Sequence, residues 1–176
     1  MRVDAFAARR LKSVTVARRA DRSGFKACNL NHALKNVAAE PFFAVVDADE
    51  ILPPNVLTDL VPHLVRNESC GFVRANHRSR PDAGSKLAQD LGVGIDIHWK
   101  WRQPLRDCFG VVMFLGHGAV LRRASWEAVG GFPERISEDL AFATAIREQG
   151  YHGRFAEDVV CLEGTPRPCA PCACAT

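Results

Sequence analysis

The feature that most constrains the fold is an apolar run that ends abruptly in acids. Residues 42–46 are apolar without alternation, and Asp47-Ala48-Asp49-Glu50 follows directly. An unalternated run of this length predicts a strand covered on both faces, as in parallel α/β sheets. We therefore expect Asp47 and Asp49 at the carboxyl end of a buried strand, which is the edge where open α/β sheets bind ligands.

The spacing of these two acids indicates a shared ligand. In an extended backbone, residues two apart direct their side chains to the same face, so both carboxylates would point one way. Their mutual repulsion would be relieved by a divalent cation, and Mg²⁺ or Mn²⁺ suits oxygen ligands and leaves open positions for phosphate oxygens. A pair of acids in a surface turn is the alternative, because aspartate favours turns.

The rest of the pattern predicts strands alternating with helices. We expect strands over about 13–17, 71–75, 111–115, 119–121, 153–156 and 159–162, and helices over about 29–39, 53–66, 86–91 and 137–150. Asn29 and Ser137 are the expected N-caps, and Gly130-Gly131-Phe132-Pro133 the expected turn. Residues 82–107 give mixed signals. The strand, helix and strand between residues 42 and 75 imply a βαβ crossover.

Composition is typical of a globular domain. The chain has 176 residues, 47% of them hydrophobic and 24% charged, which favours one domain with a real core. A net charge of +3 from scattered residues argues against nucleic-acid binding. No apolar run approaches the ~20 residues that cross a bilayer, and no secretory signal is visible. We expect a cytoplasmic chain with neither a membrane span nor a nucleic-acid partner.

The seven cysteines include a cluster near the end, Cys169, Cys172 and Cys174. Three thiolates could bind a soft metal only with a fourth ligand and an ordered scaffold. Because this stretch is rich in Pro and Ala, we expect residues 167–176 to form a disordered tail.

Two further motifs could carry chemistry. Glu138 and Asp139 begin a predicted helix, where the macrodipole favours acids without any function, yet one of them could act as a general base toward a hydroxyl. Lys26 and Asn29 flank a turn and could bind a phosphate or a ribose, although an exposed lysine is often only solvated.

The segment Gly116-His117-Gly118 is a candidate contact for a substrate. Glycines let another group approach the backbone closely, so His117 could reach a ligand, and a strand bulge would explain the glycines equally well. Trp99 and Trp101 could stack on a sugar, or one of them could belong to the core.

Four of these motifs, taken in order, resemble those of membrane-bound family 2 glycosyltransferases, the group that includes cellulose synthase and bacterial glucan synthases. They are Lys26-Ala27-Cys28-Asn29-Leu30-Asn31, the run from Phe43 to Glu50, the run from Phe114 to Arg123, and Gly130-Gly131-Phe132-Pro133-Glu134 followed by Ser137-Glu138-Asp139. The resemblance spans roughly residues 13–166.

The resemblance implies a fold and a reaction. Residues 1–166 would form a partial GT-A domain, an α/β fold with a mostly parallel sheet and flanking helices, incomplete in its N-terminal nucleotide-binding half. The implied reaction is inverting transfer of a sugar from a nucleotide-sugar donor, foremost a UDP-sugar, to the hydroxyl of a glycan or lipid-linked acceptor.

The resemblance also implies roles for individual residues. Asp47 and Asp49 would hold Mg²⁺ or Mn²⁺ on the diphosphate, and Asp47 would lie near the nucleotide together with Lys26 and Asn29. Asp139 would be the catalytic base, with Glu138 beside it. Gly116, His117 and Gly118 would line the acceptor site.

The chain also departs from the family pattern. Relatives begin with a nucleotide-binding strand and an acidic motif, and the processive ones continue with Q-x-x-R-W and helices that embed them at the cytoplasmic face of the membrane. We therefore expect a fragment with weakened nucleotide binding. One alternative is a catalytically silent remnant that binds metal or nucleotide weakly as an interaction module. Another is a haloacid-dehalogenase-like phosphotransferase, which normally has Thr or Val where Ile51 stands.

Overall fold

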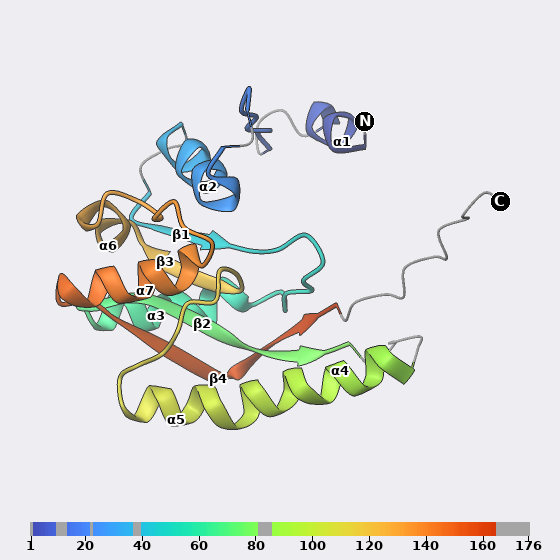
Figure 1. Cartoon of the computed structure of the whole chain (residues 1–176), viewed down its shortest axis with the longest axis vertical. Helices are drawn as coiled ribbons and strands as arrows, with labels where there is room; N and C mark the ends of the chain where they lie inside the picture. Colours follow the sequence, from blue (N-terminus) through green and yellow to red (C-terminus); the bar gives the residue numbers. More distant parts are fainter. Residues whose placement is uncertain (1, 10–13, 22, 37–39, 81–85, 165–176) are drawn as a thin grey trace.

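A four-stranded sheet forms the centre of the computed structural model, which describes residues 2–9, 14–21, 23–36, 40–80 and 86–164 (Figure 1). The strand order is β1-β3-β2-β4, with bounds β1 (Phe42–Val45), β2 (Cys70–Ser79), β3 (Ala119–Arg122) and β4 (His152–Glu163). β3 is antiparallel to both β1 and β2, whereas β2 and β4 are parallel. Three strands therefore run in one direction and β3 alone is reversed.

Helices flank this sheet, so the expected α/β class is confirmed. They are α1 (Arg2–Arg9), α2 (Phe25–Lys35), α3 (Val56–Arg66), α4 (Lys86–Ile97), α5 (Gln103–Cys108), α6 (Arg123–Ala128) and α7 (Glu138–Glu148), with a π-helical turn, η1 (His98–Arg102), between α4 and α5. The predicted βαβ crossover is β1-α3-β2. Within the described ranges, no helix is both long and apolar enough to cross a membrane.

Each face of the sheet buries its own set of side chains. On one face, Leu60 and Leu64 of α3 pack with alternate strand residues such as Val73 and Val120. On the other face, neighbouring strand residues such as Phe72 and Leu121 pack against side chains of α6, α7 and η1, among them Trp126, Phe142, Ile146 and Trp99. The two-residue period of the strands therefore divides the core between the two helical layers.

The apolar run before Asp47 forms a strand, but its predicted environment is wrong. Among the described residues β1 lies at the edge of the sheet, and Ala44 is exposed. Its hydrogen-bonded partner is the reversed strand β3, with Val45 opposite Ala119. The run is apolar because Phe43 and Val45 contact the core on one face of the sheet. On the other face, Phe42 only partly packs against the cluster that includes α3.

Several predicted boundaries also need correction. Residues 14–17 of the first expected strand form no strand, and residue 13 lies outside the described ranges. The helix expected from Asn29 begins at Phe25, because Gly24 turns the chain at its N-cap with φ 63°. Asn29 is therefore an interior helix residue. Residues 37–39 lie outside the described part.

The second half of the chain differs in two places. Residues 111–114 form no strand, so only the 119–121 part of the interrupted strand is confirmed. The two short strands predicted over 153–162 are one strand, β4, whose register against β2 jumps between Ala156 and Val160. Residues 86–108, which the sequence left mostly unassigned, form one continuous helical rod along β2 and β4 (Figure 1).

The predicted turn over residues 130–133 is present, and the helix after Ser137 ends at Glu148 before Gly150. Ser137 is the N-cap residue by position, although its side chain caps no backbone group. The predicted tail, 167–176, with Cys169, Cys172 and Cys174, lies outside the described residues.

Candidate active site

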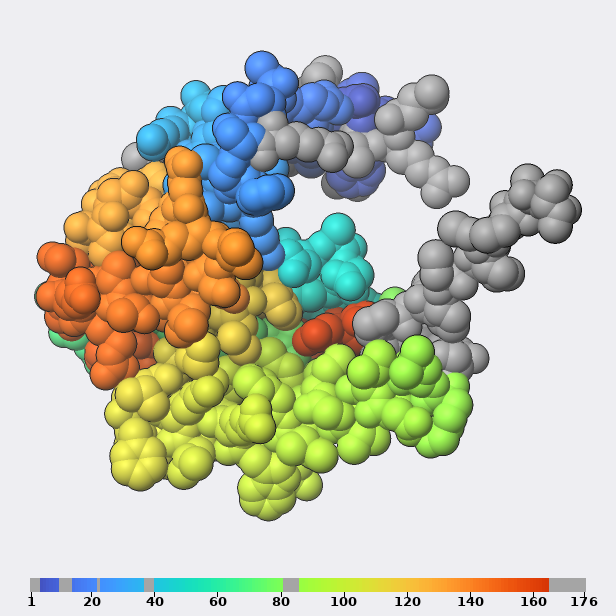
Figure 2. Space-filling model, viewed as in Figure 1, coloured from blue at the N-terminus to red at the C-terminus, as the bar shows by residue number. Residues whose placement is uncertain are grey.

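The turn after β1 and the start of α2 meet through an ion pair. Lys26 Nζ lies 2.8 Å from Asp47 Oδ1, and both side chains remain partly exposed. Lys26 is held there because it stands in the first turn of α2, directly after the Gly24 turn. In the space-filling view the cyan turn that follows β1 borders an open hollow beneath the blue N-terminal segment (Figure 2).

The start of α7 reaches the same place. Gly116 has a φ of 82°, and a Cβ placed on it would lie 3.5 Å from Lys26 Nζ and 3.6 Å from Asp139 Oδ2. The strand-end acid Asp47 and the helix-start acid Asp139 therefore lie on the same side of the molecule, on either side of Lys26 and Gly116. These distances are ordinary van der Waals contacts, so glycine is favoured at this point by its left-handed backbone and not by a lack of space.

Glu50 is the buried centre of a second polar group. Its side chain is 1% exposed, and its Oε1 lies 2.6 Å from both His77 Nε2 and His117 Nδ1. Its Oε2 accepts a hydrogen bond of 2.9 Å from the backbone N–H of Asp47. These contacts connect the turn after β1 with β2 and with the loop before β3.

The charge of Glu50 follows from these contacts. Burial by itself raises the pKa of Glu50, but the hydrogen bonds from His117, His77 and the Asp47 backbone together hold that pKa well below its usual range. Burial also lowers the pKa of His77, against the opposing effect of Glu50. An ionised carboxylate only accepts hydrogen bonds, so both imidazoles donate to Glu50.

Gly118, the second glycine of the loop, allows Glu50 and His77 to pack directly against the backbone. Gly118 has a φ of 59°, and a Cβ placed on it would lie 2.1 Å from His77 Nε2 and 2.8 Å from Glu50 Oε1. Gly118→Ala is expected to lower the free energy of unfolding by about 3 kcal/mol, about 1 from the left-handed backbone and the remainder from displacing the buried pair. Urea unfolding measures this loss.

Gly110→Ala is the matched control for that substitution. Gly110 has a similar φ of 64°, but a Cβ placed there meets no atom within 4 Å. Gly110→Ala should therefore lower the free energy of unfolding only by the cost of the left-handed backbone, about 1 kcal/mol. Equal losses for the two variants would show that the space around His77 and Glu50 is not restrictive.

Arg74 holds the loop from the other side. It is fully buried on β2, with its guanidinium 4.2 Å from the centre of the Trp99 ring. It donates hydrogen bonds to the carbonyl oxygens of Met113, Phe114 and His117. Burial lowers the pKa of Arg74 to about 9, and the nearby Glu50 and Glu163 carboxylates oppose that shift. These hydrogen bonds fix the segment through the carbonyls of residues 113, 114 and 117.

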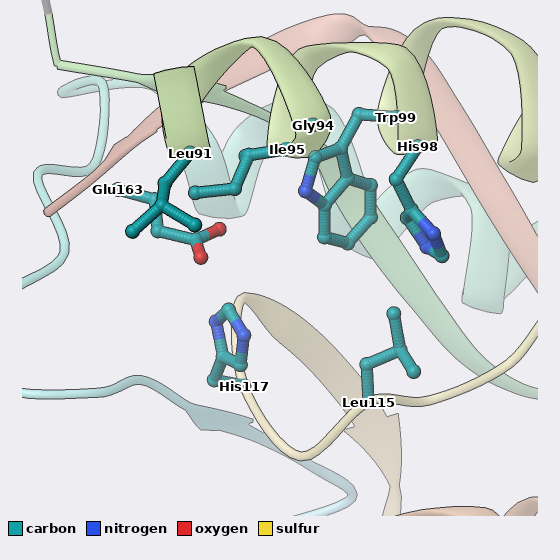
Figure 3. A pocket seen from close by; sticks show the side chains of 8 residues that line it. All are labelled: Leu91, Gly94, Ile95, His98, Trp99, Leu115, His117 and Glu163. Atoms are coloured by element: carbon teal, nitrogen blue, oxygen red, sulfur yellow. The ribbon is translucent and has the colours of Figure 1, made fainter. Parts of the chain in front are cut away.

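A cavity of about 420 Å³ lies beside His117, between the helical rod and the loop before β3 (Figure 3). Its lining residues are Leu91, Gly94, Ile95, His98, Trp99, Leu115, His117 and Glu163. Figure 3 shows Leu91, Ile95 and Trp99 on the rod facing His117 and Leu115 on the loop. The walls are therefore mainly apolar, as in small-molecule sites.

Glu163, at the end of β4, supplies an acceptor to this cavity. Its Oε2 is buried and has no hydrogen-bond partner within the described part of the chain. Burial raises the pKa of Glu163, although the neighbouring His117 acts in the opposite direction. A carboxyl group and an imidazole at one side of an apolar pocket can bind hydroxyl groups while the walls contact C–H surfaces.

Two groups of side chains could hold a divalent ion. Asp47 and Asp49 follow β1 as two oxygen donors, and Asp49 lies beside the end of β4, where a Cβ on Gly164 would be 3.2 Å from its Oδ2. Glu50, His77 and His117 bring their ligand atoms within 4.8 Å of one another. Glu50 Oε1 lies 2.6 Å from each imidazole nitrogen, which is a hydrogen-bond distance. Two ligand atoms of a tetrahedral ion lie about 3.3 Å apart. An ion there would have to displace the imidazole protons and widen the group.

The predicted residues do not all lie together. Lys26, Asp47, Asp139 and Gly116 converge, and His117 and Gly118 border the adjoining Glu50 group. Asn29 is exposed and accepts a hydrogen bond from Arg19 Nη1 at 3.3 Å. No polar contact within the described residues joins Asn29 to the Lys26–Asp47 pair. Glu138 is half-buried beside Asp139.

Asn31, the last residue of the motif that begins at Lys26, has a structural role that the sequence analysis did not predict. Its Oδ1 accepts hydrogen bonds from Trp126 Nε1 at 3.2 Å and from the backbone N–H of Phe132 at 2.8 Å, and its Nδ2 donates to Phe132 O. Asn31 thereby fixes α2 against the glycine turn that precedes Asp139. Among the tryptophans, Trp99 is core and Trp101 is exposed.

The fold and the site together define a class of protein. The sheet is mixed, because β1 and β2 both pair antiparallel with β3 and only β2 and β4 pair in parallel, so the mostly parallel sheet that the sequence predicted is wrong in that detail. A mixed α/β sheet with flanking helices, acids directly after β1 and a further acid at the start of α7 forms the arrangement of a GT-A glycosyltransferase domain. The sequence family described as "Glycosyltransferase like family 2" matches residues 3–171. The chain therefore belongs to family 2 of the glycosyltransferases.

Individual relatives agree with this assignment. The chain is 31% identical, over 132 residues, to a probable glucomannan 4-beta-mannosyltransferase of Oryza sativa subsp. japonica, covering 71% of this chain and 22% of the relative. It is 27% identical over 139 residues to a UDP-forming cellulose synthase catalytic subunit of Komagataeibacter sucrofermentans, covering 74% and 18%. The chain thus spans about a fifth of either relative.

A solved structure shares the fold. The mannosyltransferase PcManGT of Pyrobaculum calidifontis, determined with GDP-Man and Mn²⁺, superimposes with a TM-score of 0.65 at 27% identity. The match covers 93% of this chain and 44% of that protein.

Proposed function

We propose that the chain transfers a sugar from a nucleotide-sugar donor to an acceptor hydroxyl. The convergence of Asp47 and Asp139 on Lys26 and Gly116 carries this proposal. It joins two acids from distant parts of the sequence across a space open to solvent. Family membership over residues 3–171 supports the same reaction class.

Asp47, Asp49 and Lys26 form the donor side. Their mixture of carboxylates and one ammonium group suits a diphosphate bridged to a divalent ion, with Mn²⁺ or Mg²⁺ as the ion. Such an ion, when bound by Asp47 and Asp49, would neutralise charge on the departing nucleoside diphosphate. When Asp47 binds the ion, its carboxylate charge is shared with that ion, so the Lys26 ammonium group can turn from Asp47 to a phosphate oxygen of the donor.

Asp139 forms the acceptor side as the general base. It takes the proton of the acceptor hydroxyl while that oxygen forms its bond to the anomeric carbon, and the bond from that carbon to the phosphate oxygen breaks. Attack from the face opposite the leaving group inverts the anomeric centre. Asp139 suits this role because the start of α7 fixes its backbone beside Gly116.

The cavity between the rod and the His117 loop is the proposed acceptor site. Glu163 and His117 would bind hydroxyls, and the apolar walls would contact the C–H face of a sugar or the first part of a lipid linker. PcManGT was determined with GDP-Man and the cellulose synthase relative is UDP-forming, so GDP-mannose and a UDP-sugar such as UDP-glucose are the donors to test.

Metal and donor titrations test the proposal. We expect Mn²⁺ to bind, to be required for GDP-mannose or UDP-glucose binding, and to lose at least tenfold in affinity in Asp49→Asn, because one of two oxygen ligands loses its charge. Calorimetry and Mn²⁺ electron paramagnetic resonance give the affinities. Asp158→Asn, an exposed acid on β4, is the control and should bind as the parent does.

The same titrations separate the alternatives. If His117→Ala, and not Asp49→Asn, removes Mn²⁺ binding, the ion belongs to the Glu50–His77–His117 group. If metal and donor bind but no sugar is transferred to any acceptor, the chain is the silent remnant. If neither binds, both the transferase and the remnant that binds metal or nucleotide are wrong.

A further inference from the structure

The outer surface of the helical rod carries a row of large apolar side chains. Val93, Ile97, Trp101, Leu105 and Phe109 recur every four residues, and each is 52–73% exposed. Four residues overshoot one α-helical turn by about 40°. The π turn at residues 98–102 offsets this overshoot over one of the four intervals, so the row, about 24 Å long, winds gradually along the outer side of the rod.

The charges along the rod are sorted between its two sides. Between residues 91 and 109, the charged residues classed as exposed are Lys100 and Arg102, both cationic. The two acids of this stretch point toward the sheet. Asp96 accepts hydrogen bonds from the backbone and side chain of Ser79.

Asp107 is the second of these acids, and it also points toward the sheet. It pairs with Arg154 at 3.3 Å and accepts the Phe155 backbone N–H at 3.1 Å. From residue 91 to residue 109 the outward side of the rod is therefore apolar and positive; the exposed acid of the rod, Asp90, precedes this stretch and pairs with Lys86. Lys100 Nζ lies 5.5 Å from the centre of the Trp101 ring, so cation and aromatic ring share one position on the surface.

We propose that this row, Val93–Ile97–Trp101–Leu105–Phe109 with Lys100 and Arg102, is a docking surface for an anionic lipid bilayer. An amphipathic helix with aromatic and aliphatic side chains beside Lys and Arg binds in the plane of the membrane interface, with its apolar side among the headgroups. The absence of outward acids on this stretch favours an anionic lipid surface over an apolar protein surface, because a protein partner would not need the uncompensated cations.

The rod is well placed for a flat surface. It runs along one margin of the molecule in Figure 1, and the green to yellow segment forms the whole lower border in Figure 2. Its inner side lines the cavity through Ile95 and Trp99, while the row faces outward. Docking would therefore leave the cavity intact.

Vesicle co-sedimentation of the whole chain tests the proposal. We expect binding to phosphatidylcholine vesicles that contain phosphatidylglycerol, weaker binding to phosphatidylcholine alone, and a decline as salt screens the cations. Trp101→Ser with Leu105→Ser should reduce vesicle affinity at least tenfold. Lys100→Glu with Arg102→Glu should reduce affinity for the anionic vesicles by about thirtyfold or more.

The matched control uses two exposed apolar residues of α3, on the opposite face of the sheet. Leu57 and Val65 are 53% and 63% exposed, so Leu57→Ser with Val65→Ser removes comparable apolar surface. This pair should leave binding within about twofold, and circular dichroism should show that all variants fold.

Three results would overturn the proposal. The first is no sedimentation with either vesicle. The second is an equal loss of vesicle affinity in the α3 variant, Leu57→Ser with Val65→Ser, and in the row variant, Trp101→Ser with Leu105→Ser. The third is a chain that is dimeric by light scattering and becomes monomeric in the row pair without binding vesicles. That result would show that the row is the contact surface between two copies of the chain.

Discussion

Asp139→Asn is expected to lower the rate of sugar transfer by at least about 10²-fold while leaving the donor affinity within about twofold. A positioned general base contributes about 10²–10⁴-fold, and asparagine keeps the size of the side chain but cannot take a proton. A loss confined to turnover indicates a role in the chemical step and not in ground-state binding. Initial rates and donor titrations on the same preparation provide the two numbers.

Glu148→Gln is the control for that experiment. Glu148 is an exposed acid in the last turn of the same helix, α7, so the substitution removes the same charge far from Lys26 and Gly116. Its turnover should match the parent. Unchanged turnover in Asp139→Asn would exclude Asp139 as the base, and Glu138→Gln would then be the next substitution to measure.

Glu50→Ala is expected to destabilise the fold by about 3–5 kcal/mol, which corresponds to a fall in melting temperature of roughly 10 °C. The substitution leaves His77, His117 and the Asp47 backbone N–H without their acceptor in a buried region. Thermal and urea unfolding measure the loss. Glu50→Gln, which keeps one carbonyl acceptor at the same place, should lose about half as much.

Glu127→Ala provides the comparison for this prediction. Glu127 is exposed in the last turn of α6, so removing its carboxylate should change the stability by no more than about 0.5 kcal/mol. If Glu50→Ala were equally mild, the buried carboxylate would not be the link between the turn after β1 and the loop before β3.

The motifs could be predicted from the sequence because each combines local structure with chemistry. The apolar run before Asp47, the glycine pair around His117 and the acids after Ser137 each stand at the end of an element. At those positions local patterns are informative. Gly116 and Gly118 were interpreted as points of close approach, and the structure brings Lys26, Asp139, His77 and Glu50 to those two backbones.

The partners that connect the motifs could not be predicted. Glu50 was visible as the fourth residue of the acidic turn, but its role depends on His77, which belongs to none of the motifs that the sequence analysis identified. Asn31 and Arg74 are similar cases, since each satisfies carbonyls or donors supplied by segments distant in the sequence. Buried polar side chains acquire their function from such pairings.

The amino-acid order alone determined the family, the α/β alternation and the acids that end elements, since these depend on periodicity and on short motifs whose physics is local. The tertiary structure alone decided which strand pairs with β1, which acids share one side of the molecule, and that the unassigned segment is a rod with an apolar and cationic outer surface. Those outcomes depend on long-range packing, in which a side chain's environment is set by residues that no local pattern identifies.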